Sequence, residues 1–456
     1  MTTTPPRPLR RILGLTFGLA IVFGTMVGVG ILRLPGTVAA ALGSPVLIMT
    51  AWVIGGVYAL MGAVSVAELA AMIPENGGFR IYARRAFGEG TGFVVGCADW
   101  LSSVTTLAYG SITFAAFLGI LWPPAAANLR LIAICILAAF TAMHWMGLRV
   151  GSVFTQLVST AMGLLFLVLL LGCFLVPLVT HSGITTEPAA VPTRLLSIGM
   201  VLALVPALRA ILTAYDGWYA PIYMAEENIN ASRTLPRAII GGTLLVVALY
   251  LTINLALLHV LPVATLAASS LPAADAARVV LPRGSADFVT ILSMLTVLSL
   301  INGNLLFAPR ILFAIGRDGF VSERAAIVSE SGTPRPALVL TSLVASAMIL
   351  TGTFEQIIAL FADAFLIYYI SGFLAVFVLR RTEPALARPY KAFGYPFTTG
   401  IALVGSVALL IAAVAEDPRS GAVAAGFLVV CGLAYRWLAR RRQVRIMARQ
   451  AASVVP

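Results

Sequence analysis

Gly24-Thr25-Met26-Val27-Gly28-Val29-Gly30-Ile31 interrupts an apolar stretch that is long enough to cross a lipid bilayer. A second interruption, Ala214-Tyr215-Asp216-Gly217-Trp218, follows about 190 residues later in another apolar stretch. Glycine weakens a helix by about 1 kcal/mol relative to alanine. Lipid offers no water to the backbone groups that a broken helix frees, so such a break is expected only where it lines a cavity or binds a polar group. Paired breaks in the two halves of a chain are typical of a transporter substrate site.

The composition of the whole chain places it in a membrane. Of its 456 residues, 60% are hydrophobic and 11% are charged, whereas soluble domains carry about 25% charged residues. Apolar runs of about 20 residues, enough to cross the hydrocarbon core, recur throughout. We predict an all-α integral membrane protein in which residues 1–456 form a single transmembrane domain. Its twelve predicted spans are 13–40, 44–72, 90–121, 129–147, 152–178, 195–227, 237–262, 286–316, 336–352, 355–380, 396–415 and 421–438.

The two breaks divide these spans into halves. Residues 13–178 form a first repeat of five spans and residues 195–380 form a second, and each begins with a broken helix. An odd number of spans per repeat gives the two repeats opposite topologies, so we expect an inverted repeat. Residues 396–438 supply two peripheral helices, the eleventh and twelfth.

The formal net charge of +12 is explained by membrane orientation. An even number of spans puts both termini on one side, and most arginines then fall at the cytoplasmic ends of spans, as the positive-inside rule requires. The charge therefore predicts a lipid bilayer as the partner, and nucleic acid is not needed to explain it. The single lysine among 30 basic residues indicates the coding bias of a GC-rich bacterial genome, so we expect the bacterial inner membrane.

The sequence contains no pattern for catalysis or for a cofactor. The histidines have no ligand spacing, and neither a phosphate-binding loop nor a nucleophile motif appears, so we predict no enzyme, no metal and no cofactor. The four cysteines all fall within predicted spans, where they suit helix packing. The outer loops contain none, so we expect no disulfide-linked partner subunit. These residues are His144, His181 and His259, and Cys97, Cys135, Cys173 and Cys431.

The first break predicts a carboxylate site. A helix that ends near Val27 and restarts near Ile31 exposes the amides of Val29, Gly30 and Ile31 at a helix N-terminus, where the dipole favours an anion. The small residues here, Gly28 included, let a ligand approach the backbone. A packing role stays open, because Gly24 and Gly28 also form a GxxxG motif.

The second break predicts a site for an amine. Carbonyls near Thr213 and Ala214 would accept from it, and Tyr215 and Trp218 would form pocket walls. An α-amino acid carries both complementary charges on one carbon and suits two facing breaks. The alternative for Trp218 is an aromatic anchor at the membrane interface.

Asp216 is the one acid in the two breaks. Charge at membrane depth is a functional hypothesis by default, so Asp216 could face a cationic substrate or be protonated. The alternative is that it caps the restarted helix. Arg33 and Arg209, on the outer halves of the same spans, are expected to snorkel or to pair with an outer acid.

These residues carry a resemblance to a known family. The chain resembles the amino acid–polyamine–organocation superfamily, and most of all its L-type amino acid transporter branch. The matching motifs are GVGI at 28–31, AELAAMIP at 67–74 with GG at 77–78, YDGW at 215–218 with EE at 226–227 and LPRAI at 235–239, NG at 302–303, PRILFAIGRDG at 309–319, TPRPAL at 333–338, and LRRTEPALARPYK at 379–391 with GYP at 394–396. The resemblance implies an inverted-repeat fold, alternating access, a substrate carboxylate at Val29, Gly30 and Ile31, and its amine at Ala214 and neighbours.

Two departures from the family pattern concern coupling and gating. Family members commonly carry a lysine in the fifth span, where this chain has Met162 at the likeliest equivalent position. A sodium ion there would find few oxygens, among them carbonyls near Gly24 and Val27 and the hydroxyl of Ser299, so we expect sodium-independent exchange. Thr213 stands where the family often has an aromatic gate.

The remaining polar residues of the spans receive structural interpretations. Asn302, in the eighth span, is expected to reach the pocket. Glu68, Asp99 and Asp363 are lone acids without evident partners and are interpreted as satisfied structural groups, Glu68 with a basic residue of the loop that follows it.

The sequence thus predicts a secondary transporter of neutral L-amino acids that binds between the two breaks. A polyamine or cationic amino acid carrier is the alternative within the same fold, motivated by Asp216. The alternative of another class is a membrane receptor that binds amino acids without moving them.

Overall fold

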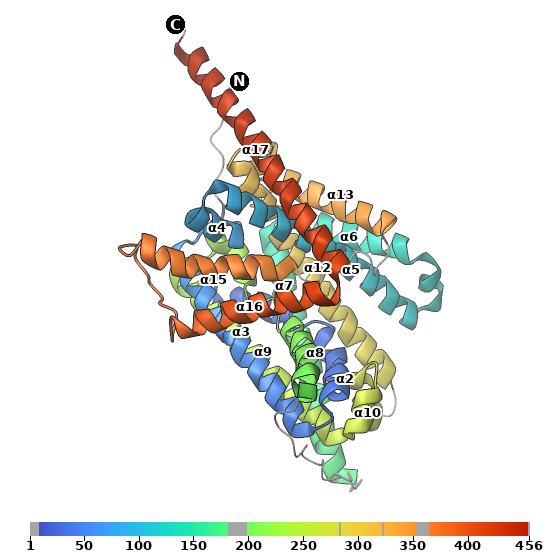
Figure 1. Cartoon of the computed structure of the whole chain (residues 1–456). Coiled ribbons are helices and arrows are strands. Elements are labelled where there is room, and N and C mark those ends of the chain that lie inside the picture. Colours follow the sequence, from blue (N-terminus) through green and yellow to red (C-terminus); the bar gives the residue numbers. More distant parts are fainter. Residues whose placement is uncertain (1–8, 181–197, 282–283, 322, 353–363, 455–456) are drawn as a thin grey trace.

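The computed structural model describes residues 9–180, 198–281, 284–321, 323–352 and 364–454. Apart from one isolated bridge between Leu13 and Asn228, all regular structure in these ranges is helical (Figure 1). The α-helices are α1 (Leu15–Met26), α2 (Gly30–Leu42), α3 (Pro45–Met72), α4 (Phe79–Phe87), α5 (Glu89–Leu121), α6 (Leu129–Met146), α7 (Leu148–Thr180), α8 (Ile198–Ala214), α9 (Ala231–Val260), α10 (Val263–Ala268), α11 (Pro272–Val280), α12 (Ser285–Arg317), α13 (Arg335–Thr351), α15 (Ala364–Thr382), α16 (Phe397–Glu416) and α17 (Pro418–Val454). Three short 3₁₀ helices are η1 (Pro123–Asn128), η2 (Ala220–Glu227) and η3 (Glu323–Ala326).

Most of these helices are long and apolar enough to cross a membrane. Within the described ranges there are nine such helices, or ten when α1 and α2, bent by 46° at their break, count as one span. Two shorter apolar helices, Leu204–Ala214 and Arg335–Thr351, add to them. The chain is therefore a multi-pass membrane protein. The predicted break within the span 195–227 is confirmed, because α8 ends at Ala214 and η2 begins only at Ala220.

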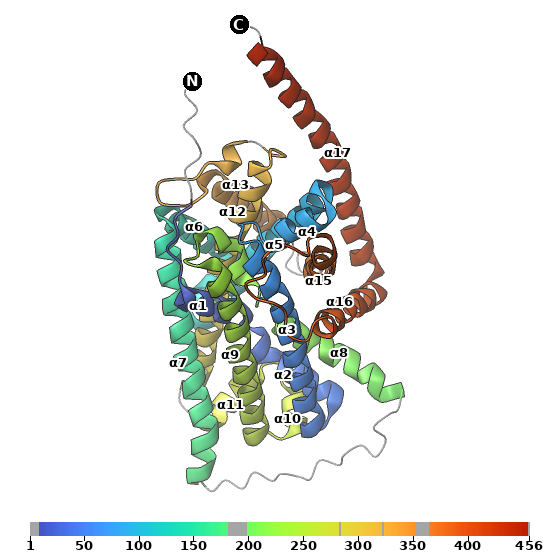
Figure 2. The same cartoon turned by 90° about the vertical axis from the view of Figure 1, so that its left-hand side faces the viewer.

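The helices differ in how deeply they are buried. α12 lies in the centre and packs against α5, α7 and α13, whereas α1 packs on α9 and α2 on α8. α16 and α17 are the periphery, with large apolar side chains such as Val404 (68% exposed) on their surface. The second half of α17 projects beyond the body of the molecule (Figures 1 and 2). Apolar side chains facing outward are stable only against lipid, which agrees with a membrane protein.

Ion pairs gather at the end of the bundle where α4 lies. Asp318 pairs with Arg80 and, at 2.7 Å, with Arg84. Arg84 also lies 3.0 Å from Glu75. The short helix α4 thus joins the end of α12 to the loop after α3.

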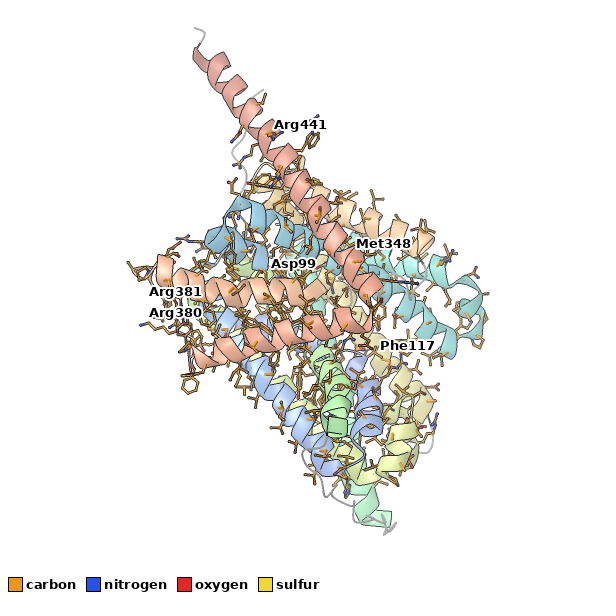
Figure 3. The ribbon with its side chains drawn as sticks, in the orientation of Figure 1. Asp99, Phe117, Met348, Arg380, Arg381 and Arg441 are labelled. Carbon is orange, nitrogen blue, oxygen red and sulfur yellow. The ribbon has the colours of Figure 1, made fainter. Side chains whose placement is uncertain are left out.

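Two of the three lone acids have buried partners. Glu68 accepts from Arg380 at 2.9 and 2.6 Å and from the amide of Ala392 at 2.7 Å, so its predicted partner in the following loop is wrong. Asp99 accepts from the Tyr223 hydroxyl at 2.8 and 3.0 Å. Figure 3 shows Asp99 among the central helices and Arg380 at the end of α15. Asp363 lies outside the described residues, as does His181.

Candidate functional site

The two chain breaks meet in the middle of the bundle. The Thr25 hydroxyl, one residue before α1 ends, donates to the Gly217 carbonyl at 3.0 Å. Gly217 has φ +109, and a Cβ there would lie 2.8 Å from the Thr25 carbonyl oxygen. Only glycine adopts this conformation readily and permits this approach. The two breaks are therefore in direct contact, through this hydrogen bond and through the close approach of Gly217 to the Thr25 backbone.

Tyr250 of α9 joins the breaks a second time. Its hydroxyl lies 2.6 Å from the Met26 carbonyl oxygen and 3.2 Å from that of Ala214. The ring is buried between Trp52, at 5.8 Å, and Tyr215, at 5.0 Å between centroids. Breaking a helix frees carbonyls that must find donors. The one hydroxyl proton of Tyr250 lies within reach of a carbonyl of each break and closer to that of Met26. Sequence reasoning missed Tyr250, since no motif marks it within its apolar helix.

The first break leaves amides free. The Gly28 amide donates to the Met26 carbonyl at 2.9 Å and the Leu32 amide to that of Val29 at 3.1 Å. Among the residues that the structure describes, the amides of Val29, Gly30 and Ile31 have no acceptor. They stand at the N-terminus of α2, where the helix dipole is positive. This end of α2 can bind an anion through its backbone.

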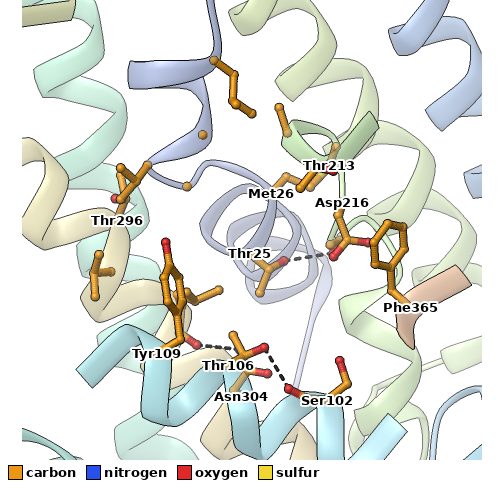
Figure 4. A pocket seen from close by; sticks show the side chains of 18 of the residues that line it. Thr25, Met26, Ser102, Thr106, Tyr109, Thr213, Asp216, Thr296, Asn304 and Phe365 are labelled. Carbon is orange, nitrogen blue, oxygen red and sulfur yellow. Dashed lines mark hydrogen bonds between the residues drawn. The ribbon is translucent and has the colours of Figure 1, made fainter. Parts of the chain in front are cut away.

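A cavity of about 590 Å³ lies against both breaks. Figure 4 shows Thr25, Asp216, Asn304 and Tyr109 around it. Its size falls within the range of small-molecule sites. The lining combines backbone of the two breaks with hydroxyl groups of α5 and α12 and with aromatic rings. From α5 come Ser102, Ser103, Thr105, Thr106 and Tyr109, from α12 Thr296, Asn304 and Phe307, and elsewhere Tyr219, Tyr223, Phe365 and Tyr368.

Six of the residues singled out in the sequence line this cavity. They are Gly28, Val29, Gly30, Thr213, Ala214 and Asp216. Val27 and Ile31 are fully buried beside it. Arg33 lines the cavity as well, and Arg209 pairs with Glu416 at the end of α16, as expected of an outer acid.

The expectation that Tyr215 and Trp218 form walls of the substrate pocket does not hold for this cavity, because neither residue lines it. Tyr215 packs edge-on against Trp52 at 5.7 Å, and Trp218 packs against Tyr369 at 5.1 Å. Both line a separate crevice beside α3 that holds almost no free volume. Trp218 is 3% exposed, so the alternative of an interfacial anchor is wrong too. Successive residues of the break point to different sides, and sequence spacing does not predict which side faces the cavity.

Asn302 does not reach the cavity. Its amide oxygen Oδ1 accepts from His144 Nε2 at 2.9 Å, and its amide nitrogen donates to Thr155 Oγ1 at 2.7 Å. Asn304 lines the cavity instead. Residues two positions apart in a helix point in directions that differ by about 200°. Asn304 therefore faces the cavity, whereas Asn302 faces the opposite way and links α12 to α6 and α7.

Asp216 faces the cavity and is hydrogen-bonded by the Tyr369 hydroxyl. The helix-cap interpretation is wrong, because the N-cap of η2 is Tyr219 and makes no side-chain cap bond. Tyr369 belongs to α15, a helix 153 residues away in the chain. The carboxyl group is also hydrogen-bonded to the Gly217 amide and the Tyr219 hydroxyl. A carboxylate has about four acceptor sites, so it can still accept from a ligand.

The region predicted to matter for coupling is buried and polar on one side. Met162 is fully buried. The Ser299 hydroxyl has no hydrogen-bond partner among the described residues, and it faces Gly24 together with the hydroxyl of Ser159. Ser159 donates to the Ala20 carbonyl at 2.8 Å.

Comparisons with known proteins agree with this geometry. A model of the amino acid permease family matches residues 13–434. The serine/threonine exchanger SteT of Bacillus subtilis (strain 168) is 28% identical over 445 residues, 94% of this chain and 96% of that protein. The b(0,+)-type amino acid transporter 1 of Mus musculus is 28% identical over 442 residues, 94% of this chain and 88% of that protein. The human large neutral amino acids transporter small subunit 2 is 28% identical over 393 residues, 84% of this chain and 72% of that protein.

The family model spans nearly the whole chain and includes both breaks and the cavity between them. Relatives at this identity are exchangers and transporters of amino acids by name. The chain therefore belongs to the amino acid permeases of the amino acid–polyamine–organocation superfamily, and it is a transport protein of the membrane and not an enzyme.

Proposed function

We propose that this permease exchanges neutral L-amino acids across the bacterial inner membrane by alternating access. The observation that carries the proposal is the row of free amides of Val29, Gly30 and Ile31 beside the cavity. Charge-assisted hydrogen bonds from a helix N-terminus suit a carboxylate. Val27 and Gly28 hold these amides in place through the turn that precedes α2.

The amine of the substrate is proposed to lie at the second break. The Thr213 carbonyl accepts one amide, from Asp216 at 3.3 Å, and the Ala214 carbonyl accepts the Tyr250 hydroxyl. Each carbonyl oxygen has two lone pairs, so one stays open for an ammonium group. The two poles of an amino acid would then bridge the two halves of the protein.

The wall formed by α5 supports a neutral substrate. It offers hydroxyl groups of Ser102, Ser103 and Thr106 and no charge. Asp216 motivates the alternative of a cationic amino acid or polyamine, because it is an acid in the cavity wall. Its bond from Tyr369 partly satisfies the carboxyl group and favours the neutral substrate. A receptor that binds amino acids without transport is the alternative of another class.

Exchange without sodium is the expected mode of coupling. Met162 supplies no fixed positive charge facing the first break, and the hydroxyls of Ser299 and Ser159 are two oxygens where a sodium ion would need several. In proteoliposomes, we expect uptake of labelled neutral amino acid to depend on unlabelled amino acid inside. We expect equal rates in sodium and choline buffers at equal pH on both sides.

Three controls separate the alternatives. Competition by arginine or putrescine, but not by neutral amino acids, would favour the cationic carrier. Binding in detergent without uptake under any internal condition would favour the receptor. Uptake that requires sodium and is lost in Ser299→Ala would place a cation beside Gly24 and contradict the proposed coupling.

The fold is proposed to contain twelve spans. Ten are the candidate spans with α1 and α2 counted as one, and the two shorter apolar helices are the other two. Residues 13–178 and 195–380 would form an inverted repeat and 396–438 two peripheral helices, with both termini cytoplasmic. All four cysteines lie within helices, which supports function without a disulfide-linked heavy chain.

This topology predicts the location of a C-terminal reporter. A fusion after Arg449 is expected to give a cytoplasmic signal, because the arginines of α17 are retained inside. The measurement pairs alkaline phosphatase, active only in the periplasm, with green fluorescent protein, fluorescent only in the cytoplasm. Phosphatase activity at this position would contradict the proposed topology.

A further inference from the structure

The peripheral helix α17 contacts α5 along one seam. At the end of the seam, Arg442 lies 3.0 and 3.2 Å from the two carboxyl oxygens of Glu89. One turn further along α5, the rings of Phe93 and Tyr435 lie 5.9 Å apart. A Cβ on Gly90 would lie 3.0 Å from the Tyr435 ring, so the two helices approach closely there.

The register of this seam brings two thiols together. Glu89, Phe93 and Cys97 recur every four residues and share one face of α5. Arg442, Tyr435 and Cys431 recur at intervals of seven and four and share one face of α17. The Cys97 and Cys431 thiols are hydrogen-bonded to each other at the next step of the ladder. Both are free cysteines, Cys431 buried and Cys97 half-buried.

We propose that Cys97 and Cys431 form a reversible oxidation site, where a peroxide joins the two thiols in a disulfide that ties α17 to α5. A disulfide needs sulfur atoms about 2.0 Å apart and Cβ atoms about 3.8 Å apart. The contacts of Glu89 with Arg442 and of Phe93 with Tyr435 set the register of these antiparallel helices and place the two thiols at the same level, as that geometry requires. Neither thiol lines the cavity of the transport site.

The reaction balances with one peroxide. One thiol attacks the peroxide O–O bond, becomes a sulfenic acid and releases one water. The second thiol attacks that sulfur, forms the S–S bond and displaces a second water. Two thiols lose two electrons and two hydrogens, and hydrogen peroxide is reduced to two waters. A thiol reductant reverses the bond by exchange.

The other two cysteines provide a matched control. Cys135 is exposed on α6 and Cys173 is buried on α7, and within the described part of the chain neither contacts another thiol. Replacing both by serine leaves a variant with only the seam pair. This background also prevents disulfides between molecules through the exposed Cys135.

The test counts thiols in membranes that contain this Cys135→Ser, Cys173→Ser variant. After treatment with hydrogen peroxide and denaturation, polyethylene glycol maleimide is expected to add nothing. Without peroxide, or after dithiothreitol, it should add two groups. Mass spectrometry should find the Cys97 peptide linked to the Cys431 peptide.

Single variants exclude oxidation of one thiol alone. In the same background, Cys97→Ser or Cys431→Ser can form a sulfenic acid with peroxide but no disulfide within the molecule, so each is expected to give no linked peptide and to regain its one thiol after dithiothreitol. Two modifiable thiols after peroxide in the paired variant would overturn the proposal. Loss of the thiol in the single variants, without a linked peptide in the paired variant, would overturn it as well.

Discussion

Gly30→Leu is expected to abolish substrate binding while the protein still folds and inserts. A Cβ at Gly30 would lie 3.3 Å from Leu34 Cδ1, a tight contact that a small shift of this flexible side-chain end relieves, and 3.7 Å from the Ala214 Cα, an ordinary contact. The rest of a leucine side chain would extend into the cavity and cover the free amides of Val29 and Gly30. Two hydrogen bonds to a charged group contribute about 1.5–3 kcal/mol each, so affinity should fall by more than about 100-fold.

Ligand-induced thermal shift and proteoliposome uptake measure this loss. Gly30→Ala should keep part of the affinity, because the methyl group alone fits. Gly400→Leu on α16 is the matched control, since a Cβ there meets nothing within 4 Å, and it should transport like the parent. Parental affinity in Gly30→Leu would remove the first break from the binding site.

Arg310→Met is expected to destabilise the fold by about 3–5 kcal/mol, the effect of leaving one partner of a buried ion pair alone. Arg310 Nε and Nη2 lie 2.7 and 2.8 Å from the two oxygens of Glu227, and the side chains are 3% and 0% exposed. The Glu227 carbonyl also accepts the amides of Ile12 and Leu13 at 3.0 Å each. Glu227 therefore ties the segment before α1 to α12.

Thermal unfolding in detergent should show the loss as a lower midpoint for Arg310→Met. Adding Glu227→Gln should restore part of it, because the uncompensated charge is removed. Arg85→Met is the control, since the Arg85–Glu383 pair is 40% and 30% exposed and such pairs contribute about 0–1 kcal/mol. Equal midpoints for Arg310→Met and Arg85→Met would contradict the assigned role.

The positions of the breaks could be predicted because their causes are local. The sequence places the end of the first half-helix near Val27 and the restart near Ile31, and the structure has α1 ending at Met26 and α2 beginning at Gly30. Glycine content and apolar length act within a few residues of the chain. The same local reasoning predicts the amides that are left free.

The partners of buried side chains could not be predicted in this way. Glu68 pairs with Arg380, 312 residues away, and not with the loop that follows it. Asn302 faces His144 while Asn304 faces the cavity. In spans that are apolar on all sides, no amphipathic pattern tells which face meets a neighbouring helix.

By itself, the sequence determined a helical membrane protein, its family, and the two points at which helices break to bind something polar. Only the tertiary structure decided what closes those breaks: Tyr250, which reaches Met26 across 224 residues, and Gly217, whose missing side chain admits the Thr25 backbone. The physical reason is the distance along the chain over which each cause acts. Apolar length and glycine flexibility are properties of a short segment, whereas hydrogen-bond partners in lipid depend on which helix faces the packed bundle brings together.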